Sequence, residues 1–495
     1  MKGVSVLLLG CAVLPRYLAA QCPDGSPPPC RIATRPGPAP NSVAVLYFDN
    51  LSPDTADLYL ADGLTEELIL RLGQVARLSV KSRAAVTRYR RFPGDPVALG
   101  RTLGVAHLVN GSVRRSGSRL RVTVELVRVA DGERVWGDFY DRSTSDLLAI
   151  EEEVARTVAT TIAGRLLPGE RSSLALRPTR NAAAYEHYLR GNFALARRRQ
   201  ADLVAAIQEY EAAGRLDSLF TQAWSRAGYA YALACGYGHP TLDLDSLLAR
   251  GQAAVGAALR NDSSSADAWM AMGLLRTIGD ARRPGSARAA FARAIALDPG
   301  NAEALHQYGD LLAALMEDSA AVALYHRALA FEPERPITLM SLARLNMIAH
   351  RYTDAMRWSD SALSIDPTFA LGHGARFAIA WLMGDAAAAK ADAQWLGGVS
   401  VALLDYRSGD TVRARGRVDS LLAPVLTATG SLPVDDANNL TFPLMAVGER
   451  DAALAVLERA RPRGLGLWAW LRAPWLDPIR NEPRFQRLLE ESRPE

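Results

Sequence analysis

The sequence predicts a fold in two parts: an α/β domain built on a mixed sheet, then an all-α superhelix of repeated helix pairs. Two patterns indicate this. Between Leu120 and Leu126 apolar and polar residues alternate, as in a strand with one buried and one solvated face. Beyond residue 180 similar residues recur 34 positions apart, as at Leu305 and Leu339, which is a period of helical repeats. A chain of 495 residues, 49% hydrophobic and 22% charged, is long enough for both parts and is not disordered in composition.

Residues 1–20 have the pattern of a secretion signal. Lys2 precedes a 12-residue apolar run that ends at Leu14. This run is too short to span a bilayer, which needs about 20 residues. We expect cleavage near Ala20. The less favoured alternative is a lipobox-like Leu8-Leu-Gly-Cys11, in which Cys11 carries a lipid and associates with the membrane. An uncleaved anchor is the remaining alternative. Each of these routes predicts an exported protein of the periplasm or cell envelope.

Residues 21–41 predict an extended tether, because they contain seven prolines and no apolar periodicity. Cys22 and Cys30 lie close together in this tether, and an oxidising compartment would favour a disulfide between them. Two cysteines without a histidine partner make poor zinc ligands. Cys235 is expected to be a small buried residue in a helix.

Residues 42–167 predict the α/β domain. The expected strands cover residues 42–48, 77–81, 106–115, 119–126 and 133–140. The expected helices carry the Leu60–Leu72 leucine face, cover residues 95–103 with Pro96 in the first turn, and run onward from a capping Ser145.

Five blocks in this domain carry a family resemblance. They are Val43-Ala-Val-Leu-Tyr-Phe-Asp-Asn-Leu51, Tyr59-Leu-Ala-Asp-Gly-Leu-Thr-Glu-Glu-Leu68, Leu103-Gly-Val105, Asn110-Gly-Ser-Val-Arg-Arg115 and Trp136-Gly-Asp-Phe-Tyr-Asp141. In this order they resemble the TolB-like amino-terminal domain of bacterial multidomain proteins. The resemblance implies a fold and a context but no reaction. Relatives often carry a kinase, a nucleotide cyclase or a winged-helix domain ahead of this unit, and none of these is expected here. Tetratricopeptide repeats often follow it.

A local charge excess lies within the domain, although the net charge of the chain is only +4. Between Arg77 and Arg128 there are twelve basic residues and two acidic ones. An anionic partner would explain this excess. The favoured explanation is a solvated strand face combined with the arginine bias of the whole chain, in which only three basic residues are lysine. Nucleic acid is not expected as a partner.

Residues 180–395 resemble tetratricopeptide repeats. The first-helix pattern is Trp224, Ala227, Gly228, Tyr231, then Trp269, Met272, Gly273, then Leu305, Tyr308, Gly309, Leu312. The second-helix pattern is Ala287, Phe291, Ala294, Pro299, then Ala321, Tyr325, Ala328, Pro333, then Ala355, Ala362, Pro367. An insertion is expected near residues 236–240. Residues 396–495 are expected to form degenerate helical pairs and a C-terminal cap that begins near Trp468.

The inner face of such a superhelix predicts the binding surface. Ten first-helix residues are candidates for partner contacts: Gln222, Ser225, Tyr229, Asp267, Met270, Glu303, His306, Asp310, Met340 and Arg344. Ordinary exposed helix residues are the alternative for each position.

No catalytic, cofactor-binding or metal-ligating motif is found in the sequence. The leading hypothesis is therefore a non-enzymatic scaffold or adaptor that binds a protein or peptide. An envelope sensor whose α/β domain binds a small or anionic ligand, and an unrecognised envelope enzyme, remain as alternatives.

Overall fold

The computed structural model describes residues 38–494 apart from 88, 91–94, 198, 238, 281–282, 397, 428–431 and 462–464. The expected signal, Cys11, the cleavage point and the Cys22–Cys30 pair lie outside the described residues, so these expectations stay predictions. Within the described ranges, no helix is both long and apolar enough to cross a bilayer.

The N-terminal domain is built around one mixed sheet with the strand order β3-β1-β4-β5-β6, in which β2 also pairs with β4. The strands are β1 (Ser42–Val45), β2 (Asp49–Asn50), β3 (Ser79–Val80), β4 (His107–Ser116), β5 (Arg119–Arg128) and β6 (Arg134–Ser143). Strand β1 runs parallel to β3 and β4, whereas β4, β5 and β6 are antiparallel. The predicted mixed sheet is confirmed, although β1 and β3 are shorter than expected.

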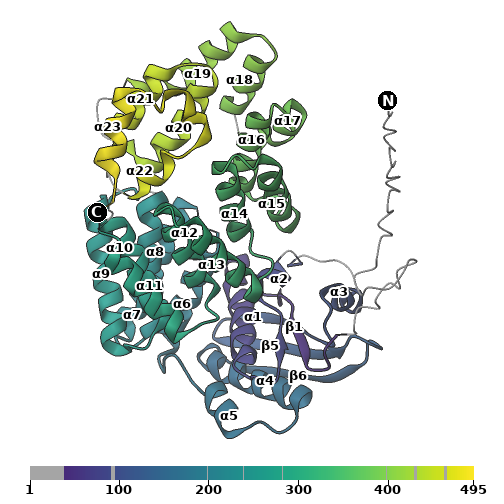
Figure 1. Cartoon of the computed structure of the whole chain (residues 1–495). Coiled ribbons are helices and arrows are strands. Elements are labelled where there is room, and N and C mark those ends of the chain that lie inside the picture. Colours follow the sequence, from purple (N-terminus) through teal and green to yellow (C-terminus); the bar gives the residue numbers. More distant parts are fainter. Residues whose placement is uncertain are drawn as a thin grey trace, which may run out of the picture.

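Helices cover both faces of this sheet (Figure 1). Helices α1 (Leu58–Gly73) and α4 (Leu147–Ala163) cover one face, and α2 (Arg83–Thr87) and α3 (Pro96–Leu103) cover the other. Val43 and Val45 of β1 belong to the cluster under α1, while Ala44 belongs to the cluster under α3. This two-sided burial explains the continuous apolar run of the first strand. Strand β5 shows the predicted alternation, because the four apolar residues of the pattern, Leu120, Val122, Val124 and Leu126, are fully buried.

The helix ends follow capping chemistry, with one difference from the prediction. The Asp95 side chain accepts hydrogen bonds from the backbone of Val97 and Ala98 at the start of α3. The predicted cap at Ser145 is wrong. Ser143 accepts from the Ser145 backbone at the start of a short 3₁₀ turn, Thr144–Asp146, and α4 begins only after that turn.

Helix α5 (Pro168–Leu174) leads into a stack of antiparallel helix pairs (Figure 1). The pairs are α6/α7 (Ala182–Leu195, Gln200–Leu216), α8/α9 (Thr221–Tyr237, Leu244–Asn261), α10/α11 (Ala266–Gly279, Gly285–Leu297), α12/α13 (Ala302–Ala314, Asp318–Phe331), α14/α15 (Pro336–Ile348, Tyr352–Ile365), α16/α17 (Ala370–Met383, Ala386–Ala393), α18/α19 (Gly398–Arg407, Thr411–Leu426) and α20/α21 (Val434–Ala446, Arg450–Arg459). The chain ends with α22 (Leu465–Trp470), the 3₁₀ helix η3 (Pro474–Ile479) and α23 (Pro483–Ser492). Two short parallel strands, β7 (Leu432–Pro433) and β8 (Ala460–Arg461), were not expected.

Close packing within each pair explains the repeat pattern. Helices α12, α14 and α16 begin 34 residues apart. A Cβ added at Gly309 would lie 2.5 Å from the Tyr325 ring, and one at Gly273 would lie 2.8 Å from Phe291. The glycine of the first helix therefore makes room for the aromatic ring of the second. The second-helix alanines of the pattern are fully buried.

The longer α8/α9 pair accounts for the 45 residues between Trp224 and Trp269. Its helices have 17 and 18 residues, whereas those of the next three pairs have 13 or 14. The expected insertion is therefore divided between longer helices and the loop that joins them.

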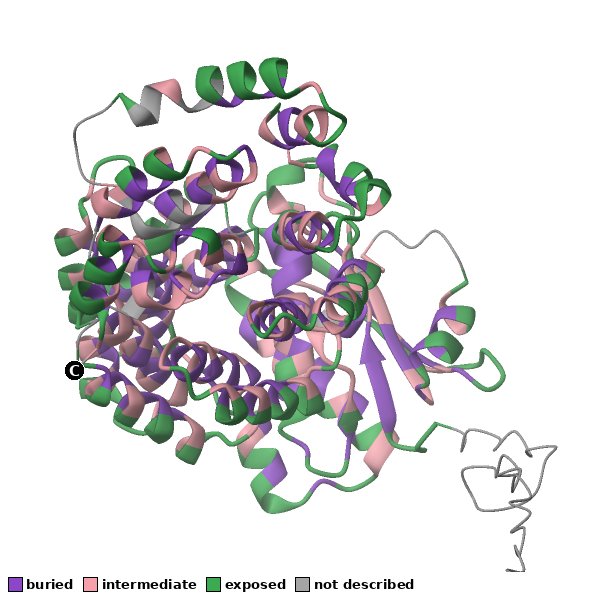
Figure 2. Ribbon diagram, turned by 45° about the horizontal axis from the view of Figure 1, so that its top comes forward, coloured by how far each residue is buried: buried purple, intermediate pink, exposed green. Residues whose placement is uncertain are grey.

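The first helices α8, α10, α12 and α14 pack against one another in succession. Together they form the surface called here the inner face. Figure 2 shows buried residues on the sides of the helices that face each other and exposed residues on their outer sides.

Candidate interaction surface

The structure places the ten predicted contact residues in two groups. Gln222 is exposed, and four side chains are half-buried: Asp267, Glu303, Asp310 and Arg344. Five are buried: Ser225, Tyr229, Met270, His306 and Met340. The expected outward position is wrong for these five, because they contact other parts of the same chain. Whether any of the ten binds a partner stays a prediction.

A polar group centred on Glu303 joins three helices of the inner face. The Tyr229 hydroxyl donates to Glu303 Oε1 at 2.6 Å, and Gln307 Nε2 donates to the same oxygen at 2.8 Å. Arg335 pairs with Glu303, and its Nη1 donates to Glu332 Oε2 at 2.7 Å. The side chain of Arg335 is only 13% exposed. The repeat consensus does not include Arg335, so it is not among the ten predicted contact residues. The only local signal for it is its position directly before Pro336, at the start of a helix.

A second group centres on Asp310 of α12. Its Oδ1 accepts from Tyr325 Oη at 2.6 Å, Ser341 Oγ at 3.0 Å and Arg344 Nη2 at 2.9 Å. His306 Nε2 lies 3.3 Å from Asp310 Oδ2. Burial alone would raise the pKa of Asp310, but the charges of His306 and Arg344 and these hydrogen bonds hold it below its ordinary value. The carboxylate thus fixes α12 against α13 and α14.

The C-terminal segment packs against part of this face. Helix α22 contacts α10 and α12, and Trp475 of η3 packs against the cluster that contains Met340. The segment predicted to cap the last helix pair therefore also contacts α10 and α12, which belong to pairs much earlier in the chain.

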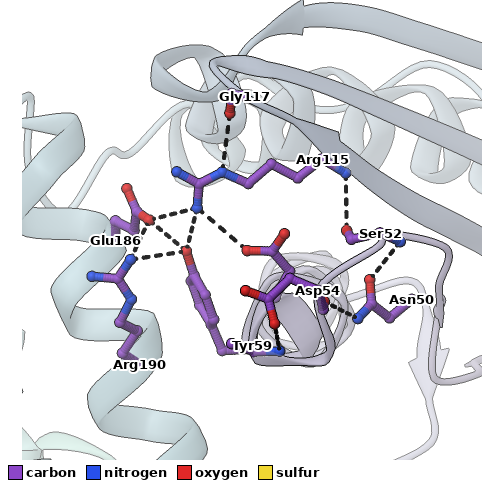
Figure 3. A network of polar contacts seen from close by, with 10 residues as sticks. Asn50, Ser52, Asp54, Tyr59, Arg115, Gly117, Glu186 and Arg190 are labelled. Carbon is purple, nitrogen blue, oxygen red and sulfur yellow. Dashed lines mark hydrogen bonds and ion pairs between the residues drawn. The ribbon is translucent and has the colours of Figure 1, made fainter.

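The α/β domain docks on the first helix pair through a polar network (Figure 3). The Tyr59 hydroxyl donates to Glu186 Oε1, which also accepts from Arg115 Nη1 at 2.9 Å and Arg190 Nη2 at 2.6 Å. Arg115 also donates to the Gly117 carbonyl at 3.2 Å. Tyr59 and Arg115 belong to two of the five blocks quoted above, so these blocks contribute to docking as well as to the domain's own fold.

A buried cluster lies below this network. Tyr185 of α6 donates to Glu151 Oε2 at 2.7 Å, and Arg71 Nη2 lies 3.8 Å from the same oxygen. Burial, and then the nearby Glu67, raise the pKa of Glu151 well above its ordinary value. A Cβ added at Gly63 of α1 would lie 2.8 Å from the Leu189 side chain, so the two helices are in close contact. One hydrophobic cluster runs from the sheet through α6 to α12, and the domain and the first repeats therefore share a core.

A cavity at this junction has a volume of about 10 Å³ and is lined by Arg115, Tyr185 and Glu186 among others. This is the lower limit for one water molecule.

The basic stretch between Arg77 and Arg128 is largely neutralised by acids from elsewhere in the chain. Arg77 pairs with Glu170, Arg83 with Glu66 and Arg90 with Asp62. Further pairs join Arg115 to Glu186, Arg119 and Arg121 to Asp141, and Arg128 to Asp131 and Glu133. This pairing favours the explanation of the charge excess as an ordinary strand face.

Asp62 of α1 gives a pH-dependent prediction. Burial raises its pKa from 3.8 to about 6; Arg90 and Arg83 oppose this shift, and Glu66 adds to it. The folded state therefore binds more protons than the unfolded state between these values, and stability falls as pH rises through them. Compared with Asp62→Asn, the wild type should lose about 2 kcal/mol between pH 4 and pH 7, measured by urea unfolding. A constant difference between the two proteins across this range would contradict the prediction.

Other sites considered in the sequence have ordinary surroundings. Asp49, considered as a strand-end carboxylate, is exposed. Cys235 is half-buried in α8, and burial raises the pKa of its thiol to about 12, as expected for a packing residue. No group of three or more metal-ligating side chains is found among the described residues.

Together, the helix pairs and the docked sheet domain define a repeat protein of tetratricopeptide type with a mixed α/β domain at its N-terminal side. No protein-family model matches the chain. A curated relative named "Putative adenylate cyclase 3", from Rhizobium meliloti (strain 1021), is 34% identical over 175 residues. The match covers 35% of this chain and 30% of that protein, so the chain spans less than a third of the relative.

Solved structures similar to the chain are repeat proteins. PilW, described as a type IV pilus biogenesis factor, has 24% identity and a TM-score of 0.34, covering 44% of this chain and 93% of PilW. A tetratricopeptide repeat protein from Parabacteroides merdae has 14% identity and a TM-score of 0.32, covering 63% and 99%. YrrB, described as having an unusual peptide-binding site, has 20% identity and a TM-score of 0.25, covering 39% and 91%. These scores are low, so the repeat assignment depends on the spacing and packing described above.

Proposed function

We propose that this protein is a non-enzymatic interaction scaffold of the bacterial cell envelope that binds a protein or peptide on the inner face of its repeats. The observation that carries the proposal is the inner face itself, whose first helices are fixed to one another by the Glu303 and Asp310 groups. A fixed surface binds a partner with little loss of conformational entropy. The sheet domain, whose five blocks support a TolB-like unit, is docked on the first pair and shares its core.

Site-specific crosslinking tests the binding surface. A photo-crosslinking residue at Gln222, exposed at the start of α8, should capture a partner in envelope extract from cells expressing the full chain. The matched control is Gln252, exposed on the second helix α9, where capture should be at least tenfold lower. Equal capture at Gln222 and Gln252 would exclude the inner face as the binding surface. So would a partner that is captured only when the crosslinking residue is placed in the sheet domain.

The envelope location is tested separately, by cell fractionation with N-terminal sequencing of the mature chain. A protein found in the cytosol with Met1 intact would contradict export. The cyclase-named relative provides the activity test. The purified full chain with ATP and Mg²⁺ should form no more cyclic AMP than a boiled sample, and formation above that level would contradict the non-enzymatic assignment.

A further inference from the structure

The C-terminal segment of residues 467–480, called here the tryptophan segment, has two different faces. Leu467, Leu471, Leu476 and Ile479 are buried in the hydrophobic cluster of the C-terminal helices. This apolar face holds the segment to its own unit. The opposite face carries tryptophans and an arginine that contact the inner face of pairs far earlier in the chain.

An ion pair and a ring contact join the second face to α12, α13 and α14. Arg472 donates from Nη1 to the Ala313 carbonyl at 3.0 Å and from Nη2 to Asp318 Oδ2 at 2.7 Å. Ala313 lies in the last turn of α12, where the helix dipole favours a cation. The guanidinium of Arg344 lies 5.8 Å from the centre of the Trp470 ring, within range for a cation–π contact.

Tryptophans on either side of Arg472 fill apolar positions on the same face. Trp468 packs against the large hydrophobic cluster that includes Met270 of α10. Trp475 lies between the two units, because it packs against the cluster that contains Met340 of α14 and also against the C-terminal cluster, where its ring centre lies 5.2 Å from that of Phe442. Asp477 lies 3.6 Å from His350, at the end of α14. The segment thus crosses the inner face of three successive pairs. Figure 1 shows the C-terminal helices lying beside α10 and α12.

We propose that the face formed by α10, α12 and α14 is a binding site for peptides that carry an arginine between aromatic residues, and that the tryptophan segment occupies this site until a partner displaces it. The inference rests on the proposed function and names the partner class. It is carried by charge complementarity, because Asp318 and the C-terminal end of α12 receive the arginine, while hydrophobic clusters and the guanidinium of Arg344 contact the neighbouring rings. The contacts can be exchanged: Asp318 is 41% exposed, and partly exposed ion pairs are individually weak.

A labelled peptide of the segment's own sequence, Trp-Ala-Trp-Leu-Arg-Ala-Pro-Trp, tests displacement by fluorescence anisotropy with the full chain. Arg472→Glu repels Asp318 and should open the site, so the peptide should bind at least tenfold more tightly than to the wild type. The matched control is Arg484→Glu, because Arg484 forms a similar two-bond pair with Glu458 inside the C-terminal unit. This control should bind the peptide as the wild type does.

The reverse substitution tests the site itself. Asp318→Arg should also open the site, but it should prefer by at least tenfold a peptide whose arginine is replaced by glutamate. Equal peptide affinity in Arg472→Glu, Arg484→Glu and the wild type would overturn the inference, as would the same preference for the arginine peptide in Asp318→Arg. The proposed function is tested separately, by crosslinking at Gln222. If a partner is captured there but the peptide binds equally to the wild type and the variants, this inference is overturned and the proposed function is not.

Discussion

Replacing Gly111 with alanine is expected to reduce the free energy of unfolding by about 3 kcal/mol, the upper part of the range for an overpacked core. A Cβ added at Gly111 of β4 would lie 2.1 Å from the Thr123 carbonyl oxygen of β5 and 2.5 Å from the Phe48 ring. The carbonyl belongs to the paired neighbouring strand and cannot move without disturbing the β4–β5 register. Urea unfolding followed by circular dichroism measures the loss.

Gly256→Ala is the matched control for this substitution. An added methyl group on α9 would approach only the flexible end of Arg260, at 3.3 Å. This variant should be as stable as the wild type or more stable by up to about 1 kcal/mol, because alanine favours a helix over glycine. Adding Phe48→Leu to Gly111→Ala separates the Phe48 ring from the Thr123 carbonyl as the cause of the lost stability. If the double variant recovers most of the lost free energy of unfolding, the ring is the main obstacle to the methyl group. If it recovers none, the carbonyl is. Wild-type stability in Gly111→Ala would contradict the close approach.

The mixed sheet and the helix pairs could be predicted because their signals are local. The alternation in β5 and the 34-residue spacing of α12, α14 and α16 depend on residues close in the sequence. Only the structure shows why glycine is required at Gly111, in the Asn110-Gly block. A side chain at this position would collide with atoms of β5 and of Phe48. A local sequence pattern therefore identifies this glycine but does not show why glycine is required there.

The burial of the inner face could not be predicted in the same way. Exposure of a first-helix residue depends on what packs near it. Met340 belongs to a cluster against which Trp475, 135 positions further along the chain, also packs. The same holds for Arg115, which meets Glu186 of the first pair only after the sheet domain has docked. Contacts over such separations leave no periodic pattern in a single sequence.

Replacing Arg71 with methionine should weaken the junction between the sheet domain and the repeats. Arg71 is 7% exposed, and its Nη1 donates to the carbonyls of Leu174 and Leu176 at 2.9 and 3.2 Å. Its positive charge also opposes the raised pKa values of Glu67 and Glu151. Methionine would leave the buried carbonyl of Leu174 and the part-buried carbonyl of Leu176 without this donor. The buried carbonyl alone predicts a loss of about 1–3 kcal/mol. Calorimetry should show a shift of the transition or its division into two.

The loss in Arg71→Met should grow with pH, because the folded state must then keep protons on Glu67 and Glu151 while the unfolded state releases them. Adding Glu151→Gln should reduce that pH dependence, since the amide oxygen still accepts from Tyr185 and no longer titrates. Arg288→Met is the matched control, because the Arg288–Glu317 pair is partly exposed and its removal should cost at most about 1 kcal/mol. If Arg71→Met behaved like this control, with a single unshifted transition at every pH, the two parts would be held together by the shared hydrophobic core alone. The docking network of Tyr59, Arg115 and Glu186 would then set only the orientation of the sheet domain against the repeats.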